Sequence, residues 1–307
     1  MSSMTLQTRP ARDAAVRPLK ALTQAPALAW PTLAIFVSAI GIIACSDALA
    51  LRGLLPLWAG CLINSLAGYS LFSVVHDSIH RAASSNTRLN DWLGRIGLVS
   101  VSPMVTLGLF RWGHIQHHRF ANGPRDPDAW LHGAAWSLPL RWVLIDVWYF
   151  VYILKAIRGG DKVAARHFKP TLAACALTAL GIAAACHYGY GMPLLVLYFL
   201  PARITLVLLG FSFFWLPHLP HDTPQEQNLY RATSVRLGLE WLMTPLLQNQ
   251  NFHLLHHLYP SAPFYNNGRL WRLLEPELRR HDLAIQHGFA IQPTIHRGSA
   301  PQEQTHA

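Results

Sequence analysis

Four long apolar stretches constrain this chain more than any other feature of its sequence. Each is 18 to 24 residues long, and the only Asp, Glu, Lys or Arg within them is Arg203. About 20 apolar residues suffice for a helix to cross a bilayer, where the backbone must satisfy its own hydrogen bonds. We therefore predict an all-α integral membrane protein with about four transmembrane helices, at residues 27–45, 53–75, 171–188 and 193–216.

The amino-acid composition indicates the same class. Of 307 residues, 51% are hydrophobic and only 13% are charged, whereas about a quarter of the residues of a soluble domain are charged. The net charge of +10 comes from scattered lysines and arginines without a dense basic run. The sequence therefore does not indicate a nucleic-acid-binding protein.

The distribution of basic residues predicts the orientation in the membrane. The loop between the first two apolar stretches contains Arg52, and the loop between the last two contains no lysine or arginine. Most other basic residues fall near the termini or in residues 76–135, 155–170 and 217–280. By the positive-inside rule, we expect both termini and these three segments to face the cytoplasm.

Two shorter apolar segments and one charge need separate interpretation. Residues 96–110 contain Pro and Gly and are too short to span, which favours a re-entrant or interfacial segment. Residues 136–157 carry three charged side chains among aromatic and aliphatic ones, which is typical of an interfacial amphipathic helix. Arg203 is expected either to reach towards the membrane surface or to face a polar cavity.

The chain is expected to divide into three parts. Residues 1–26 are polar and lack the pattern of a cleaved signal, so we interpret them as a cytoplasmic tail. Residues 27–275 form one membrane domain, and residues 276–307 a C-terminal polar tail.

The sequence is unusually rich in histidine, and most of its histidines are clustered. Ten of the 17 histidines form four groups, all on the predicted cytoplasmic side. Residues spaced by three or four share one face of a helix, so the histidines spaced this way can converge on a metal. A tetrahedral zinc takes about four ligands, so this number suits two metals, although imidazole alone does not select which metal. The groups are His76 and His80; His114, His117 and His118; His218 and His221; and His253, His256 and His257.

Two other kinds of metal site fit the pattern less well. The zinc protease motif HExxH requires Glu directly after the first histidine, and residue 77 is Asp. A membrane haem protein would place single axial histidines inside the spans rather than clusters at their ends. Both observations favour a two-metal site at the membrane surface.

The histidine motifs resemble those of the integral-membrane fatty acid desaturase/hydroxylase superfamily, whose signature is HxxxH, HxxHH and a later HxxHH. The resemblance covers about residues 60–270. Locally the chain is most similar to bacterial carotenoid (β-carotene) hydroxylases, in the stretches 114–119 (HIQHHR), 215–221 (WLPHLPH) and 251–263 (NFHLLHHLYPSAP).

The resemblance implies a cofactor and a location. Proteins of this kind hold a non-haem di-iron centre and use O2 with two electrons from a small reduced carrier such as ferredoxin. The expected architecture is a histidine-rich cap above the membrane helices. We accordingly expect an integral protein of a bacterial cytoplasmic membrane, with the histidines facing the cytoplasm.

The resemblance also implies roles for individual residues, and none is catalytic beyond the metal ligands. The ligands that it implies are His76, His80, His114, His117, His118, His253, His256 and His257. A ninth ligand is expected between the second and last motifs, where His218 fits best and His221 competes. Neighbouring polar residues are expected to orient the imidazoles through the second ring nitrogen, although a plain turn explains the Asp-Pro-Asp sequence equally well. These orienting candidates are Asp77, Asp126, Asp128, Asp222 and Asn251.

The implied activity is the oxidation of a lipid dissolved in the bilayer. The resemblance predicts an oxidoreductase that introduces oxygen or a double bond at unactivated C–H bonds, and both a carotenoid ring and a fatty-acyl chain remain open as substrates. The alternative is a non-enzymatic membrane metal protein, such as a transporter or sensor. A transporter would place polar ligands near the bilayer midplane, where these spans contain few.

Overall fold

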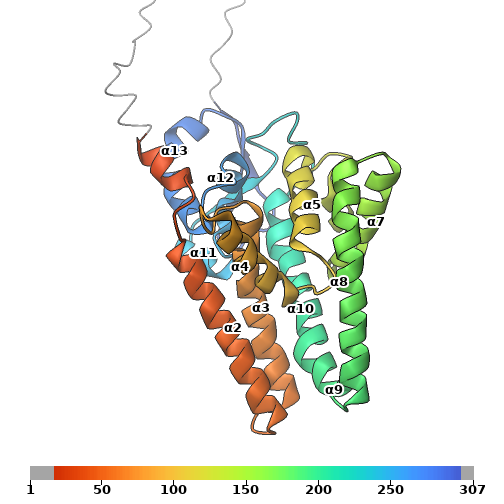
Figure 1. The fold of residues 1–307 in the computed structure, drawn as a ribbon. Helices are drawn as coiled ribbons and strands as arrows, with labels where there is room; N and C mark the ends of the chain where they lie inside the picture. Colours follow the sequence, from red (N-terminus) through yellow and green to blue (C-terminus); the bar gives the residue numbers. More distant parts are fainter. Residues whose placement is uncertain (1–16, 299–307) are drawn as a thin grey trace, which may run out of the picture.

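The computed structural model describes residues 17–298, so residues 1–16 and 299–307 of the two predicted tails lie outside the described part. Four long helices stand side by side and extend from one end of the molecule (Figure 1). They are α2 (Trp30–Leu51), α3 (Leu57–Ile79), α8 (Lys162–His187) and a last helix over Gly191–His218. All four are long and apolar enough to cross a membrane, which confirms the predicted all-α membrane fold.

The last spanning helix changes its winding along its length. It consists of α9 (Gly191–Leu194), η3 (Leu195–Phe199), α10 (Leu200–Leu209), η4 (Gly210–Trp215) and η5 (Leu216–His218). Both η3 and η4 are π-helical, a winding that is frequent near functional sites. Together η4 and η5 bring Phe213, Phe214 and His218 to the end of the bundle, where all three are buried.

Small residues on α3 hold the helices at close range. A Cβ atom on Gly68 would lie 2.9 Å from Thr205 Oγ1, and one on Gly60 would lie 2.6 Å from Leu197 Cδ2. Across the same contact, Thr205 donates a hydrogen bond of 3.1 Å to the carbonyl of Ser65. Such small residues and polar contacts hold helices together in lipid, where burying apolar surface gains little.

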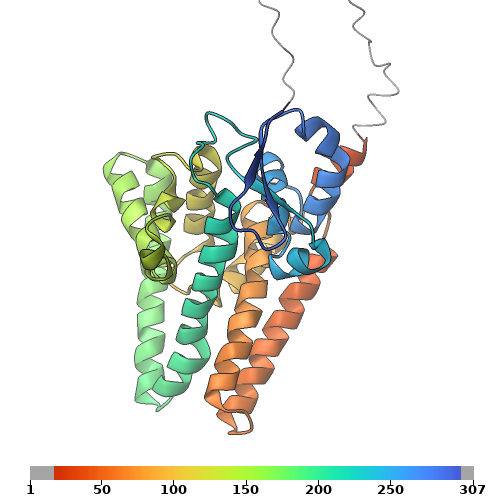
Figure 2. The same ribbon diagram turned by 180° about the vertical axis from the view of Figure 1, so that it is seen from behind.

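Shorter elements gather above the ends of the spanning helices (Figure 2). The first half of this cap packs α5 against α8 and buries Tyr149 and Ile153 of α7. The second half, after the last spanning helix, covers the end of α3. The elements are α4 (Thr87–Val99), α5 (Leu107–Phe120), η1 (Pro127–Leu131), η2 (Ala135–Ser137), α6 (Leu138–Val143), α7 (Ile145–Arg158), α11 (Glu240–Leu246), η6 (Gln250–Phe252), α12 (His253–Leu258), η7 (Phe264–Asn266) and α13 (Asn267–Leu278).

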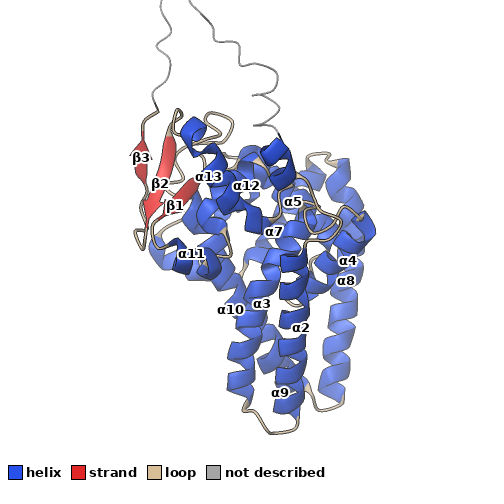
Figure 3. Cartoon of the chain, turned by 90° about the vertical axis from the view of Figure 1, so that its left-hand side faces the viewer, coloured by secondary structure: helices blue, strands red, loops and turns tan. Residues whose placement is uncertain are grey.

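A small sheet lies beside α11 and α13 (Figure 3). β1 (Ser234–Leu237) pairs in parallel with β2 (Leu283–His287), which pairs antiparallel with β3 (Thr294–His296). Leu283 and Ile285 are buried in one cluster with Leu255 of α12. The described part of residues 276–307 is therefore not the polar tail that we expected, because strands this short give little periodic signal. Residues 17–26 differ too, since a helical segment there packs Leu19 and Leu22 on the same cluster.

Two segments predicted as single elements are divided. Residues 96–110 comprise the end of α4, a loop and the start of α5, where the Thr106 hydroxyl accepts a hydrogen bond from the Leu109 amide and caps the new helix. The segment predicted as re-entrant or interfacial therefore consists of two helix ends joined by a loop. Residues 136–157 are likewise interrupted at Leu144, between α6 and α7.

Arg203 takes neither of the two predicted arrangements. Its guanidinium pairs with the buried carboxylate of Asp146 on α7, with Nη1 at 2.9 Å from Oδ1, and also donates to the carbonyl of Val143 at 2.9 Å. Ser102 donates to the other carboxylate oxygen of Asp146 at 3.2 Å. An opposite charge within reach removes the cost of a lone arginine in the bundle and ties α6 and α7 to α10.

We expect Asp146→Ala to destabilise the protein, because it leaves a partly buried guanidinium without its counter-charge. The cost of breaking such a pair is about 3 kcal/mol. Thermal unfolding of the detergent-solubilised protein, followed by tryptophan fluorescence, measures the change. The double variant Asp146→Leu/Arg203→Met is expected to recover much of the loss, since it removes both charges. An unchanged unfolding temperature for Asp146→Ala would contradict the anchoring role of this pair.

Candidate metal centre

Four elements bring nine histidines to one place at the end of the bundle. α3 supplies two at its C-terminal end, α5 supplies three on its last turns, η5 supplies one and α12 supplies three. Spacings of three and four on α5 and α12 point side chains to the same side of each helix. The nine are His76, His80, His114, His117, His118, His218, His253, His256 and His257.

Four of these side chains form what we call the first group, namely His76, His80, His114 and His256. One ring nitrogen of each lies within 4.8 Å of those of the others. The Nε2 atoms of His76 and His80 are buried and have no hydrogen-bond partner within residues 17–298. Buried polar atoms normally have partners, so unpaired imidazole nitrogens that face one another suit a bound metal cation.

The second group consists of His117, His218, His253 and His257, all buried and with ligand atoms within the same 4.8 Å. The Nε2 atoms of His117 and His218 are 3.0 Å apart, and those of His253 and His257 are 3.1 Å apart. Four convergent nitrogens again match the ligand number of one metal ion. The donor sets of both groups therefore fit one metal each.

His118 lies between the two groups. Its Nε2 is 3.1 Å from Nε2 of His114 and 3.0 Å from Nε2 of His256, and its ring stacks on His257 with centroids 4.2 Å apart. His221, the predicted competitor of His218, belongs to neither group. It stacks instead on His132, with ring centroids 3.7 Å apart.

Burial determines the charge of these imidazoles. It lowers the pKa of six of them outside the spans well below the ordinary histidine value, and neighbouring histidines add to this effect. Imidazoles with such low pKa values are neutral at pH 7, which is the form that binds metal. The six are His80, His114, His118, His253, His256 and His257.

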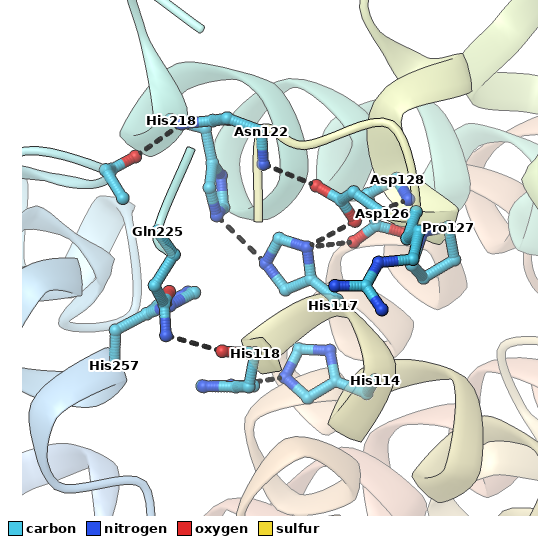
Figure 4. Close-up of polar contacts among 12 residues, drawn as sticks. His114, His117, His118, Asn122, Asp126, Pro127, Asp128, His218, Gln225 and His257 are labelled. Atoms are coloured by element: carbon cyan, nitrogen blue, oxygen red, sulfur yellow. Dashed lines mark hydrogen bonds and ion pairs between the residues drawn. The ribbon is translucent and has the colours of Figure 1, made fainter. Parts of the chain in front are cut away.

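His117 differs because two carboxylates lie behind it. Its Nδ1 is 2.9 Å from Asp126 Oδ1 and 3.3 Å from Asp128 Oδ2 (Figure 4). Burial opposes a charge on His117, but these carboxylates outweigh it and raise its pKa to about 9. Holding a proton on Nδ1 leaves Nε2 directed at the second group, as carboxylates do behind metal-bound histidines. The Asp-Pro-Asp turn thus also orients a histidine.

The sequence did not reveal three further supporting side chains. Gln250 lies 2.5 Å from His253 Nδ1, and Gln225 lies 2.7 Å from Nδ1 of His257. Tyr149 of α7 donates a hydrogen bond of 2.9 Å to Asp128. Gln250 precedes its histidine by three residues, which is a weak signal, but Gln225 and Tyr149 are distant in sequence from the groups that they support.

The other three predicted orienting residues form no hydrogen bond or ion pair with a histidine of either group in the described part of the chain. Asp77 accepts hydrogen bonds from the Thr32 hydroxyl and the Phe264 amide, so it joins α2, α3 and η7. Asp222 pairs with Arg231, and Asn251 donates to the hydroxyl of Thr244. Their positions next to the histidines in the sequence direct them away from the centre.

The side of the centre nearest the spanning helices is apolar. A narrow void there is lined by Phe72, Phe213 and Phe214 together with histidines of both groups, including His76 and His114. The rings of Phe72 and Phe213 lie about 6 Å from His76, at 6.1 and 5.8 Å. A metal held here would therefore have a water-poor, apolar surface on this side.

We expect Tyr149→Phe to weaken metal binding without unfolding the protein, because it frees Asp128 behind His117. Loss of an outer hydrogen bond costs about tenfold in metal affinity, which chelator competition measures. Tyr152→Phe on the same helix is the matched control, since Tyr152 bonds only the carbonyl of Arg125 and is expected to retain full affinity. Equal metal retention in the two variants would contradict the role of Tyr149.

Comparison with known proteins shows three desaturases with related sequences. The chain is 26% identical over 282 residues to the chloroplastic omega-6 fatty acid desaturase of Spinacia oleracea, covering 78% of this chain and 57% of that protein. It is 33% identical over 102 residues to the sn-1 oleoyl-lipid 12-desaturase of Arthrospira platensis, covering 33% and 28% respectively. An omega-3 fatty acid desaturase of Caenorhabditis elegans is 36% identical over 83 residues, covering 26% and 19%. The chain thus spans at most 57% of the length of these relatives.

A family comparison covers much more of the chain. The model of the family described as fatty acid desaturase matches residues 52–289, which include three of the four spanning helices and both histidine groups. The superfamily predicted from the histidine motifs is confirmed, whereas the closer likeness to carotenoid hydroxylases stays a prediction. The chain belongs to the fatty acid desaturase family.

Proposed function

We propose that this protein is an O2-dependent membrane oxidoreductase that removes hydrogen from the fatty-acyl chain of a lipid at a non-haem di-iron centre. One observation carries the proposal. Two groups of four converging histidines lie at the end of a four-helix membrane bundle, directly against an apolar void. Family membership supports the same reaction class.

The proposed ligands follow the two groups. His76, His80, His114 and His256 would hold one iron, and the second group, His117, His218, His253 and His257, the other. His118, which touches both groups, is proposed as a further ligand between them. Bound iron would supply the oxidising power for an unactivated C–H bond, which no side chain can supply alone.

The remaining side chains of the centre orient the imidazoles and keep water away from them. Asp126 and Asp128 hold the proton on Nδ1 of His117, while Gln225 and Gln250 fix two imidazoles of α12. The phenylalanines around the void exclude water, which keeps the reactive centre from side reactions.

We propose a fatty-acyl substrate rather than a carotenoid. By name, all three relatives reported above are fatty-acyl desaturases. A small ferredoxin-like protein is the proposed electron donor, and the cytoplasmic face of a bacterial membrane the proposed location of the centre. A metal transporter is disfavoured because the histidines cluster at the ends of the spans rather than at mid-height.

His256→Ala is expected to lose bound iron and turnover together. Losing an outer hydrogen-bond partner already weakens metal binding by about 10- to 100-fold, and losing a ligand should cost at least as much. Iron content and the acyl chains of total lipid, analysed by mass spectrometry after expression with a ferredoxin system, provide both readouts. The control His287→Ala removes an exposed histidine of β2 and should change neither. Full turnover in His256→Ala would remove α12 from the site.

The variants His218→Ala and His221→Ala separate the two candidates for the place between the second and last motifs. We expect His218→Ala to lose the iron of the second group, because His218 lies 3.0 Å from His117 within that group. His221→Ala should keep its iron and its turnover, since His221 packs against His132 and Trp215 outside both groups. The reverse result would assign the ligand to His221.

A further inference from the structure

A second cavity, of about 510 Å³, lies outside the histidine centre between α4, α5 and α8. In Figure 1, α4 and α8 flank the lower end of α5, and the loop that joins α4 to α5 runs between them. The polar side chains that line the cavity include Arg95, Arg111 and His167, and the apolar ones include Pro103, Val105 and Ala174. Nothing in the proposed di-iron chemistry uses this cavity.

The polar wall of this cavity carries an excess of positive charge. Arg111 is fixed in place, because it pairs with Asp91 and donates to the carbonyls of Ile79 and Ser78. Arg95 is exposed and forms no ion pair or hydrogen bond within the part of the chain that the structure describes. One arginine is thus balanced by Asp91, and the other is available to an anion.

The opposite wall belongs to the membrane part of the protein. Pro170 and Ala174 of α8 line it, and both lie within the spanning helix Lys162–His187. The cavity therefore joins a basic rim to an apolar wall at the end of a span. This combination matches an amphipathic molecule whose charged head lies at the membrane surface and whose chain lies in hydrocarbon.

Between this cavity and the histidine centre lies a short series of apolar side chains, each of which lines two neighbouring cavities. Leu98 and Val105 line both this cavity and a small inner cavity of about 40 Å³. Phe72 and Phe214 in turn line both the inner cavity and the void against the histidines. The carboxylate of Asp146 at the inner cavity is engaged by Arg203, so this route offers an apolar surface.

We propose that the basic cavity binds the anionic headgroup of the acyl lipid substrate, whose chain passes between Leu98 and Val105 to the histidine centre. The inference rests on the proposed function and adds the substrate class to it. The headgroup is a carboxylate, as in a free fatty acid, or a phosphate, as in a phospholipid, because both pair with arginine. Such a site selects against a carotenoid, which carries no charged group.

The test compares lipids that differ only in the charge of the head. Native mass spectrometry of the full-length, iron-loaded protein in detergent measures the binding of oleic acid against oleyl alcohol, and of dioleoylphosphatidic acid against dioleoylglycerol. We expect the anionic member of at least one pair to bind about tenfold more tightly, as for a single charged hydrogen bond. Preference in the first pair only identifies a carboxylate, and preference in the second only identifies a phosphate.

Substitutions at and away from the cavity test whether the anionic lipid binds there. Arg95→Gln should abolish the preference, whereas Arg88→Gln, at an exposed arginine of the same helix outside the cavity, should retain it. Ala174→Trp should obstruct the cavity and lower binding of the anionic lipid about tenfold, whereas Ala176→Trp, on the exposed surface of α8, should not. Iron content and elution volume verify that each variant is folded.

Failure of the headgroup site and failure of the proposed reaction give different results. Equal binding of the charged and neutral lipids, or an unchanged preference in Arg95→Gln, would overturn the headgroup site even if the protein desaturates lipids. A preference that Arg95→Gln abolishes, in a protein without any turnover, would keep the headgroup site and reject the proposed reaction. Binding needs neither O2 nor an electron donor, so the two hypotheses are tested separately.

Discussion

The rest of this structure depends on burying nine imidazoles with their nitrogens facing one another. Buried ring nitrogens such as Nε2 of His76 and His80 have no hydrogen-bond partner in the described chain, which would be costly if nothing but protein filled the space between them. Convergence requires α3, α5, η5 and α12 to meet at one end of the bundle. The small residues of α3 and the pairing of Arg203 with Asp146 keep those helix ends in place.

The two histidine groups are held by different means. In the second group, three imidazoles are bonded from behind, by the Asp-Pro-Asp turn, Gln225 and Gln250. In the first group, Nδ1 of His114 has no partner among residues 17–298, and aromatic rings such as Phe72 and Phe110 pack against the imidazoles instead. Hydrogen bonds therefore fix the second group, and aromatic packing fixes the first.

Local patterns in the sequence predicted the spanning helices and the histidine motifs, because both depend on short-range spacing. Length and hydropathy are enough to identify a span, and spacings of three and four are enough to place His253 and His256 on one side of a helix. Contacts between distant segments were not predictable in this way. Tyr149, Gln225 and the partner of Arg203 depend on how segments pack, and β2 pairs with a strand about 50 residues earlier in the chain.

The same reasoning explains why neighbours of a histidine in sequence proved a poor guide to its partners. Adjacent residues on a helix point about 100° apart, so Asp77 is directed at Thr32 and Phe264 when His76 is directed at the centre. Asp126 succeeds because it lies on a turn that folds back over α5, nine residues after His117. A polar residue can hydrogen-bond a buried histidine when a turn brings the chain back over that histidine. Asp77 is not on such a turn and instead joins α2, α3 and η7 around the centre.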